Sequence, residues 1–365
     1  MSRLLAAIIM MCMLTGCGTE QRILEDLGMI QTASYDLEEN NKLRVTINMP
    51  VSATDSTIKK MLLTAVTDSS KEARLLFSNQ TELTVVSGQV RNTLFGLDLA
   101  KAGIHRHVDT LLRDTSMSLG VKVTIINGKA GELLSKNYKQ HSETGQYINR
   151  MLEKRGSGNG IMPSSLYQFT RDYHDDGIDP IAPIVKDTGE DAEMDGIALF
   201  QDDRYMMKIP AKKALIFTLF KRNLKQGEII IHLENKKNPK DIVMLSNIMS
   251  KRKVKVHHLA NNRFKVDISA SIRGSVLEYT GNKDLVKKEQ RHKIEEEISQ
   301  YISSQGEQMI KDMQKNKVDS LGIGQYVRNS LSYAEWKSLN WRNVYPQVEV
   351  NCHAKVLIKN YGKYS

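Results

Sequence analysis

The residue with the clearest chemistry in this 365-residue chain is a cysteine near its start. Arg3 is followed by an uninterrupted apolar run, Leu4 to Leu14, which has the length of a signal-peptide core and is too short to cross a bilayer. The run ends in Leu14-Thr15-Gly16-Cys17, the pattern of the bacterial lipoprotein box. We therefore predict that residues 1–16 are a signal peptide. Cys17 is then the lipid-attachment residue, an N-palmitoyl, S-diacylglycerol cysteine. The alternative is an ordinary secretory signal that contains a cysteine by chance.

The other two cysteines indicate that the exported chain has no disulfide. Cys12 leaves with the signal peptide and Cys17 is lipidated, so Cys352 has no partner. This is typical of a Gram-positive type of cell envelope. Cys352 lies in Val348–Ile358, where apolar and polar residues alternate as in a strand with one buried face. We expect Cys352 to be a small core residue rather than a nucleophile, with His353 on the opposite face.

Residue patterns that would support catalysis or metal binding are absent from the sequence. It contains no HExxH, CxxC, GxSxG or Walker A motif. The glycine-rich stretch 156–160 follows an expected helix instead of preceding one. Four clustered aspartates lack the spacing and the closing glutamate of a calcium loop; they are Asp172, Asp175, Asp176 and Asp179. We therefore predict no catalytic residue, no metal and no cofactor, and we favour binding or assembly over an enzyme.

The chain is basic, with a formal net charge of +10. The 51 basic and 42 acidic residues after residue 16 give the mature chain +9. The positive charge is scattered, and its densest stretch, Lys237–His258, is interrupted by apolar residues. We interpret that stretch as the solvated face of a strand and predict no nucleic-acid partner. Contact of the positive charge with anionic lipid headgroups stays open.

The first part of the chain, to about residue 185, alternates between expected strands and helices, which predicts a mixed α/β domain. The expected elements are a strand over Leu43–Val51, a helix over Ser69–Asn79, two helices over Thr93–Asp114 broken near Gly103, a strand, turn and short helix over Leu119–Leu134, and helices over Thr144–Lys154 and after Pro163.

An acidic, proline-containing stretch, Tyr173–Gly196, then suggests a linker. After it we expect a hairpin over Asp195–Ile209, a helix opened by Pro210, strands over Glu228–Glu234 and Arg263–Arg273, a long helix over about Lys283–Lys315, and a last strand. The overall prediction is an α+β, multi-domain mixed α/β fold, whose last domain packs the long helix on an antiparallel sheet.

Four segments, in order, resemble the Ger(x)C family, the lipoprotein C subunits of bacterial spore germinant receptors. They are "RILEDLGMIQTASYD" (Arg22–Asp36), "LAKAGIHRHVDTLLRDTSMSLGVKVTIINGKAGELL" (Leu99–Leu134), "DGIALFQDDRYMMKI" (Asp195–Ile209) and the closing stretch Asn316–Gly362 with Trp336 and Trp341. The chain departs from the family at Gly18-Thr19, where a tryptophan is common, and at Met206-Met207-Lys208, where the family tends to have Leu-Val-Gly.

The resemblance implies a non-catalytic subunit at the outer face of the spore inner membrane, held there by its lipid. It implies two integral-membrane receptor subunits as partners, with a role in receptor assembly and nutrient-triggered germination. It also implies three domains, which we place at 17–185, 195–250 and 251–365, with a linker at 186–194. A solute-binding lipoprotein of a membrane transporter and a surface-anchored enzyme are the alternatives.

The remaining conspicuous residues have structural explanations. Asp319, Gly322 and Gly324 are expected to form a turn that closes the long helix, since glycine permits a positive φ. Trp336 and Trp341 are expected to be core anchors more than partner contacts. No ligand-binding residue is predicted.

Overall fold

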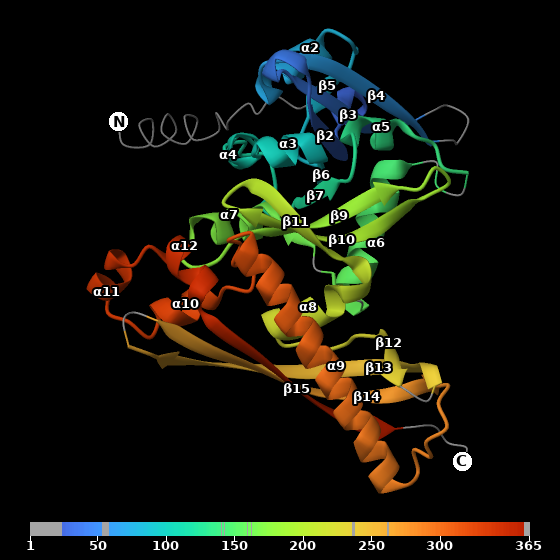
Figure 1. Cartoon of the computed structure of the whole chain (residues 1–365). Helices are drawn as coiled ribbons and strands as arrows, with labels where there is room; N and C mark the ends of the chain where they lie inside the picture. Colours follow the sequence, from blue (N-terminus) through green and yellow to red (C-terminus); the bar gives the residue numbers. More distant parts are fainter. Residues whose placement is uncertain are drawn as a thin grey trace, which may run out of the picture.

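The computed structural model describes residues 24–52, 58–139, 141, 143–158, 160–161, 163–235, 238–260 and 263–360. Its strands form a nine-stranded sheet, a four-stranded sheet and a small pair. Figure 1 shows the larger sheet in the upper part of the molecule, the four-stranded sheet in the lower part, and helix α8 (Ala214–Lys221) between them. The fold is mixed α/β, as predicted.

The nine-stranded sheet has the order β11-β10-β9-β7-β6-β2-β3-β4, with β8 also paired to β7. Its strands are β2 (Thr32–Leu37), β3 (Leu43–Ser52), β4 (Ile58–Thr67), β6 (Asn92–Gly96), β7 (Lys122–Ile126), β8 (Ser164–Ser165), β9 (Ile181–Asp187), β10 (Ala192–Gln201) and β11 (Arg204–Pro210). Strands β2, β6, β7 and β9 pair in parallel in the middle, and antiparallel hairpins extend both sides. The separate pair joins β1 (Leu27–Met29) to β5 (Thr84–Val86).

Neighbouring residues of these strands enter two different hydrophobic cores, because side chains alternate between the faces of a sheet. Phe95 and Ile125 belong to one core, whereas Leu94 and Ile126 belong to the other. The helices of this part are α2 (Ser70–Ser78), α3 (Leu97–Ala102), α4 (His105–Leu112), α5 (Ala130–Ser135), α6 (Thr144–Gly158) and α7 (Leu166–His174). The core that contains Leu94 continues through α8 into the lower sheet, and Ala214–Phe220 of α8 are all buried in it.

The lower sheet has the order β12-β13-β14-β15. Its strands are β12 (Ile229–Asn235), β13 (Asn238–His258), β14 (Phe264–Tyr279) and β15 (Glu349–Asn360). The first three are antiparallel, but β15 pairs with β14 in parallel, because the chain returns to the same end of the sheet through helix α9 (Lys288–Lys315). The long helix lies on this sheet, as predicted, and begins five residues later than expected.

Helix α9 also covers the free edge of β15. The hydroxyl oxygens of Ser303 and Ser299 accept hydrogen bonds from the backbone N–H groups of Ala354 and Val356, both at 2.9 Å. The Glu295 carboxylate accepts from Ile358 N–H at 2.8 Å. An uncovered strand edge invites pairing with another chain, so these three side chains close the sheet on this side.

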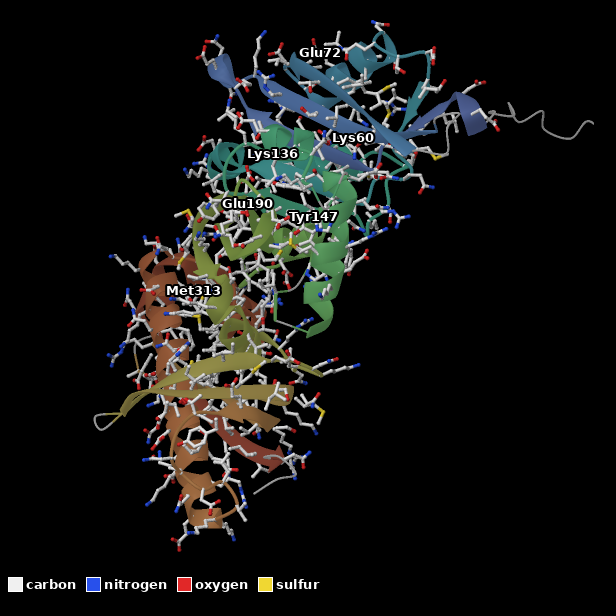
Figure 2. All side chains as sticks on the ribbon, turned by 90° about the vertical axis from the view of Figure 1, so that its right-hand side faces the viewer. Lys60, Glu72, Lys136, Tyr147, Glu190 and Met313 are labelled. Carbon is white, nitrogen blue, oxygen red and sulfur yellow. The ribbon has the colours of Figure 1, made fainter. Side chains whose placement is uncertain are left out.

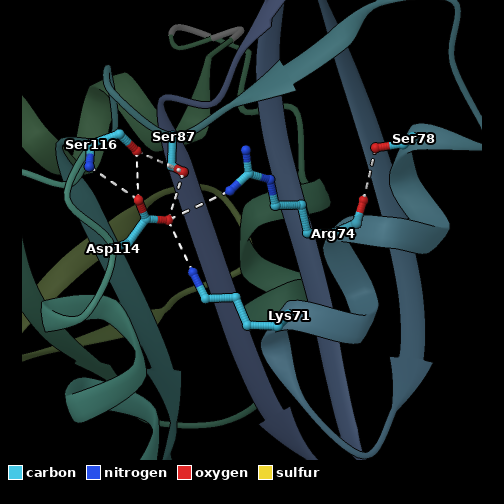
Figure 3. Close-up of polar contacts among 6 residues, drawn as sticks. All are labelled: Lys71, Arg74, Ser78, Ser87, Asp114 and Ser116. Atoms are coloured by element: carbon cyan, nitrogen blue, oxygen red, sulfur yellow. Dashed lines mark hydrogen bonds and ion pairs between the residues drawn. The ribbon is translucent and has the colours of Figure 1, made fainter.

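A polar cluster around Asp114 fixes helix α2 to the loops beside it (Figure 3). The Asp114 carboxylate lies 3.1 Å from Lys71 Nζ and 3.7 Å from Arg74 Nη1, both on α2. It also accepts hydrogen bonds from the Ser87 hydroxyl at 3.2 Å and the Ser116 hydroxyl at 2.7 Å. Partial burial opposes its ionisation, but the hydrogen bonds from Ser116 and Lys71 prevail and lower its pKa to about 2. The helix lies where it was predicted, and Ser69 caps it by accepting a hydrogen bond from Glu72 N–H.

Two of the expected elements are wrong. Thr93–Gly96 belongs to strand β6 and not to a helix, although the chain does break at Gly103, where φ is +119°. Residues 186–194, expected to be a linker, contain the end of β9, a turn and the start of β10. The Tyr147 hydroxyl holds this hairpin by donating a hydrogen bond to the Ala192 carbonyl at 3.0 Å. Lys136 forms an ion pair with Asp187 at the end of β9. Figure 2 labels Lys136 and Tyr147, together with Glu190, which lies in the turn of the hairpin.

Candidate functional site at the junction of the two halves

We call the part of the chain before α8, with the nine-stranded sheet, the first half, and the part from α8 onward, with the four-stranded sheet, the second half. The conspicuous residues of the sequence meet where the loop after α7, in the first half, contacts the segment after α9, in the second. That segment contains α10 (Ile323–Arg328), α11 (Tyr333–Ser338) and α12 (Trp341–Val344). A cavity of about 510 Å³ lies between the two, lined on one side by 175–179 and on the other by 336–342. We call the polar contacts around this cavity the junction site. Figure 1 shows α10, α11 and α12 gathered below α7.

Asp319 is the centre of the junction site. Its carboxylate accepts hydrogen bonds from Ile323 N–H at 2.9 Å, Gly324 N–H at 2.7 Å and Trp341 Nε1 at 3.1 Å. Gly322 has φ +71°, which confirms the predicted glycine turn. Complete burial raises the pKa of Asp319 to about 7, although the hydrogen bonds favour the charged form.

A second buried aspartate comes from the other half. Asp179 accepts hydrogen bonds from Asp319 N–H at 2.7 Å and from Asp202 N–H at 3.3 Å. Burial raises the pKa of Asp179 as well, and its charge raises that of Asp319. Arg342 Nη2 lies 3.5 Å from Asp179 and 2.6 Å from Asp202. Two carboxyl groups from distant segments are therefore confined together with one guanidinium group beside them.

The other loop aspartates bind cationic and aromatic side chains of the C-terminal segment. Asp175 accepts from Arg328 at 2.6 Å, and Asp176 from Lys337 at 3.1 Å and from Trp336 Nε1 at 3.4 Å. These carboxylates hold protein partners, and no group of three or more His, Cys, Asp or Glu side chains suited to a metal occurs among the described residues.

The two backbones also touch at a pair of glycines. A Cβ atom on Gly177, where φ is +91°, would lie 2.5 Å from the backbone carbon of Gly324. Gly177 accepts a backbone hydrogen bond from Gln325 N–H at 3.0 Å. The aspartate hydrogen bonds of the junction site involve charged groups, and such hydrogen bonds are stronger than those between neutral groups. Together with the glycine contact, they hold the two halves tightly together.

The structure brings together Asp175, Asp176, Asp179, Asp319, Trp336 and Trp341, which the sequence presented as separate features. Trp336 is buried and Trp341 half-buried, as expected of anchoring residues. Arg328 and Lys337 were missed, because one basic residue in a basic chain carries no signal until its partner is known.

The two cysteines of interest fall differently. Cys17, the predicted lipid-attachment residue, and the signal peptide 1–16 lie outside the described residues. Cys352 is a free, buried side chain on β15, and burial raises the pKa of its thiol to about 12, which suits the predicted core position. Among the described residues, no helix is long and apolar enough to span a membrane.

Comparisons with known proteins cover nearly the whole chain. A family model of the spore germination protein N-terminal domain matches residues 20–187, and a model of the spore germination B3/GerAC-like C-terminal region matches 195–362. The chain is 25% identical to spore germination protein GerQC of Bacillus cereus, covering 99% of both chains, and 21% identical to the putative spore germination protein YfkR of Bacillus subtilis (strain 168), covering 97% of this chain and 95% of that one.

The fold is similar to a solved structure. The crystal structure of the GerBC protein matches with a TM-score of 0.55 and 13% sequence identity, covering 89% of this chain and 96% of that chain. At this identity the likeness concerns the fold alone. Together with the two family models it leads to one conclusion: the chain belongs to the GerAC/GerBC-like family of spore germination proteins.

Proposed function

We propose that this chain is the lipid-anchored C subunit of a spore germinant receptor, needed for receptor assembly and for nutrient-triggered germination. The observation that carries the proposal is the order of matches, with a lipoprotein box followed at once by two family segments that fill the rest of the chain. The proposed role is binding and relay without catalysis.

The proposed partners are two integral-membrane subunits, and the proposed location is the outer face of the spore inner membrane. Cys17 would carry the lipid, and two acyl chains suffice for stable anchoring where one is marginal. Only six residues separate Cys17 from the first described residue, Leu24, so this tether of seven Cα-to-Cα steps spans at most about 25 Å. The end of the molecule that carries β1 and β5 would therefore stay close to the bilayer.

The junction site supports a relay role. Its contacts join a loop of the first half to three short helices of the second, so a displacement of either half is transmitted to the other. Assembly with membrane subunits would use the molecule as one body, because the core that runs through α8 is shared by both halves.

The test of the anchor is Cys17→Ala in the sporulating organism, with Cys12→Ala as the matched control. Cys12 is removed with the signal peptide, so its variant should behave as wild type. Cys17→Ala should move the protein from the membrane fraction to the soluble fraction and slow germination on the receptor's nutrient. Gene deletion with a screen of single nutrients identifies that nutrient. Normal germination of Cys17→Ala spores on every nutrient would refute the proposal.

A further inference from the structure

A second, larger cavity lies between the two halves, next to the junction site, and the two cavities share Ile178 in their walls. Its volume is about 840 Å³, within the range of small-molecule sites. The first half contributes α7 and the start of β7, and the second contributes α8, β13 and α10 (Figure 1). Five cationic side chains and two carboxylates line it among the described residues; they are Lys122, Arg171, Lys221, Arg222, Arg252, Glu153 and Asp172.

Two of these cations already have partners. Lys122 Nζ lies 3.0 Å from the Glu153 carboxylate, and Arg171 Nη2 lies 2.6 Å from that of Asp172. Lys221, Arg222 and Arg252 have no carboxylate within 4.0 Å in the described part of the chain. The cavity wall therefore carries three cations without an ion-pair partner.

Lys221 and Arg252 are partly withdrawn from water, whereas Arg222 is exposed; the carboxylates of Asp172 and Asp319 act on Lys221 from beyond ion-pair distance. Lys221 donates one hydrogen bond, to the Ser320 carbonyl at 2.6 Å, and burial lowers its pKa to about 8. Burial also lowers the pKa of Arg252. Arg252 donates from Nη1 to the Tyr326 hydroxyl at 2.8 Å, but its Nε is buried with no hydrogen-bond partner. The backbone carbonyls at the C-terminal end of α8 offset part of the positive charge of Lys221. They do not provide an acceptor for the Nε–H group of Arg252.

We propose that this cavity binds a small oxyanion, a carboxylate or a phosphate group, through Lys221, Arg222 and Arg252. A guanidinium fork matches the oxygens of either group, and a buried ammonium group gains most from an anionic partner. Holding a cation away from water costs desolvation free energy, and replacing the cation by an apolar residue removes that cost. Binding of an anion would offset the same cost, which is a functional reason to keep these charges. The site is separate from the lipid anchor and does not depend on the proposed receptor role.

The experiment is calorimetric titration of the full-length chain, purified from membranes in detergent, at constant ionic strength. Succinate and inorganic phosphate are the two probes, and succinamide is the neutral control. We expect saturable binding of succinate or phosphate and none of succinamide. The preferred probe distinguishes a carboxylate from a phosphate ligand.

Variants locate the binding. Arg252→Gln and Lys221→Met should each weaken binding about tenfold or more, since each removes a charged hydrogen-bond donor. Lys253→Gln is the matched control, because Lys253 is exposed on the opposite face of the same strand. Without ligand, Lys221→Met should keep or raise the Tm, whereas a purely structural lysine would lower it.

Two results would overturn the proposal. One is the absence of saturation by either anion in the millimolar range. The other is an equal loss of affinity in Lys253→Gln, which would mean general attraction to a basic surface. If Arg252→Gln does not fold, Arg222→Gln decides, because Arg222 is the most exposed of the three; a Lys221→Met variant that does not fold would count against the proposal.

Discussion

Asp319 combines complete burial with three hydrogen bonds and a second aspartate beside it. Its position explains why Trp341 is placed where it is, since the indole N–H of Trp341 donates to the Asp319 carboxylate. A neighbouring carboxyl and the loss of water both favour the protonated form. The same residue that fixes the junction therefore makes it sensitive to pH.

We predict that the contribution of Asp319 to the free energy of unfolding falls as the pH rises between about 4 and 7, because the folded state holds a proton on Asp319 that the unfolded chain has already lost. Burial lowers the pKa of His107 to about 4, and His107 therefore contributes in the opposite direction over much of this range. One such group gives a slope of up to about 1.4 kcal/mol per pH unit. Denaturant titrations of wild type and Asp319→Asn across this range measure it. Asp179 and His107 still titrate in the variant, so the prediction concerns the difference between the two proteins. The slope of the free energy of unfolding against pH should be more positive in Asp319→Asn than in wild type, and equal slopes would contradict the prediction.

Two glycines separate backbone strain from crowding. Gly177 and Gly189 have nearly the same φ, +91° and +92°, but a Cβ on Gly189 would meet nothing within 4 Å, whereas one on Gly177 would strike Gly324. We expect Gly189→Ala to cost about 1 kcal/mol from φ alone, and Gly177→Ala about 3 kcal/mol or more. Chemical denaturation gives both values. Equal costs would mean that the glycine contact does not hold the joint.

At the scale of elements, local patterns predicted most of the fold. Some features depend only on the residues of the segment that shows them. They are the alternation in β14 and β15, the apolar faces of α8 and α9, and the cap at Ser69. The predicted helix over Thr93–Gly96 was wrong because a short apolar run does not distinguish a buried strand from a helix. The predicted linker over residues 186–194 was wrong because it rested on their acidic composition. The pairing of β9 with β10, which places these residues in a hairpin, depends on tertiary context.

The candidate site was less predictable than the elements. The turn at Gly322 could be inferred from its glycines, but the bond from Asp319 N–H to Asp179 joins residues 140 positions apart. The same holds for Asp36, whose carboxylate accepts from Ala130 and Gly131 N–H, both at 2.7 Å, and so fixes α5 on β2. Contacts of this kind appear only when the sheet order is known.

At the scale of the whole molecule, the two family segments meet inside one hairpin. The first ends at residue 187, the last of β9, and the second begins at 195, within β10. Strand β9 shares seven residue pairs with β10 but only two with β7. The division of the chain into 17–185, 195–250 and 251–365 stays a prediction, and the sheet continues across its first boundary.

We predict that a fragment ending at residue 187 is less soluble than one ending at 210. The shorter fragment leaves β9 without its main partner, and an unpaired apolar edge promotes aggregation. The longer fragment retains β10 and β11. The soluble fraction after expression and the cooperativity of thermal unfolding compare them, with the full chain as reference. Equal behaviour of the two fragments would show that β10 is dispensable for the sheet.

The hairpin also bears on the order in which the protein is made. In the proposed export of this chain from its N-terminus, β2, β6, β7 and β9 would reach the outside before β10 does. The large sheet stays open along β9 until the residues from Thr188 to Gln201 have followed. During that interval the edge is exposed to extracytoplasmic proteases and to other nascent chains. Under the proposed export, the time needed to move this one short stretch across the membrane sets how long the edge of β9 is vulnerable.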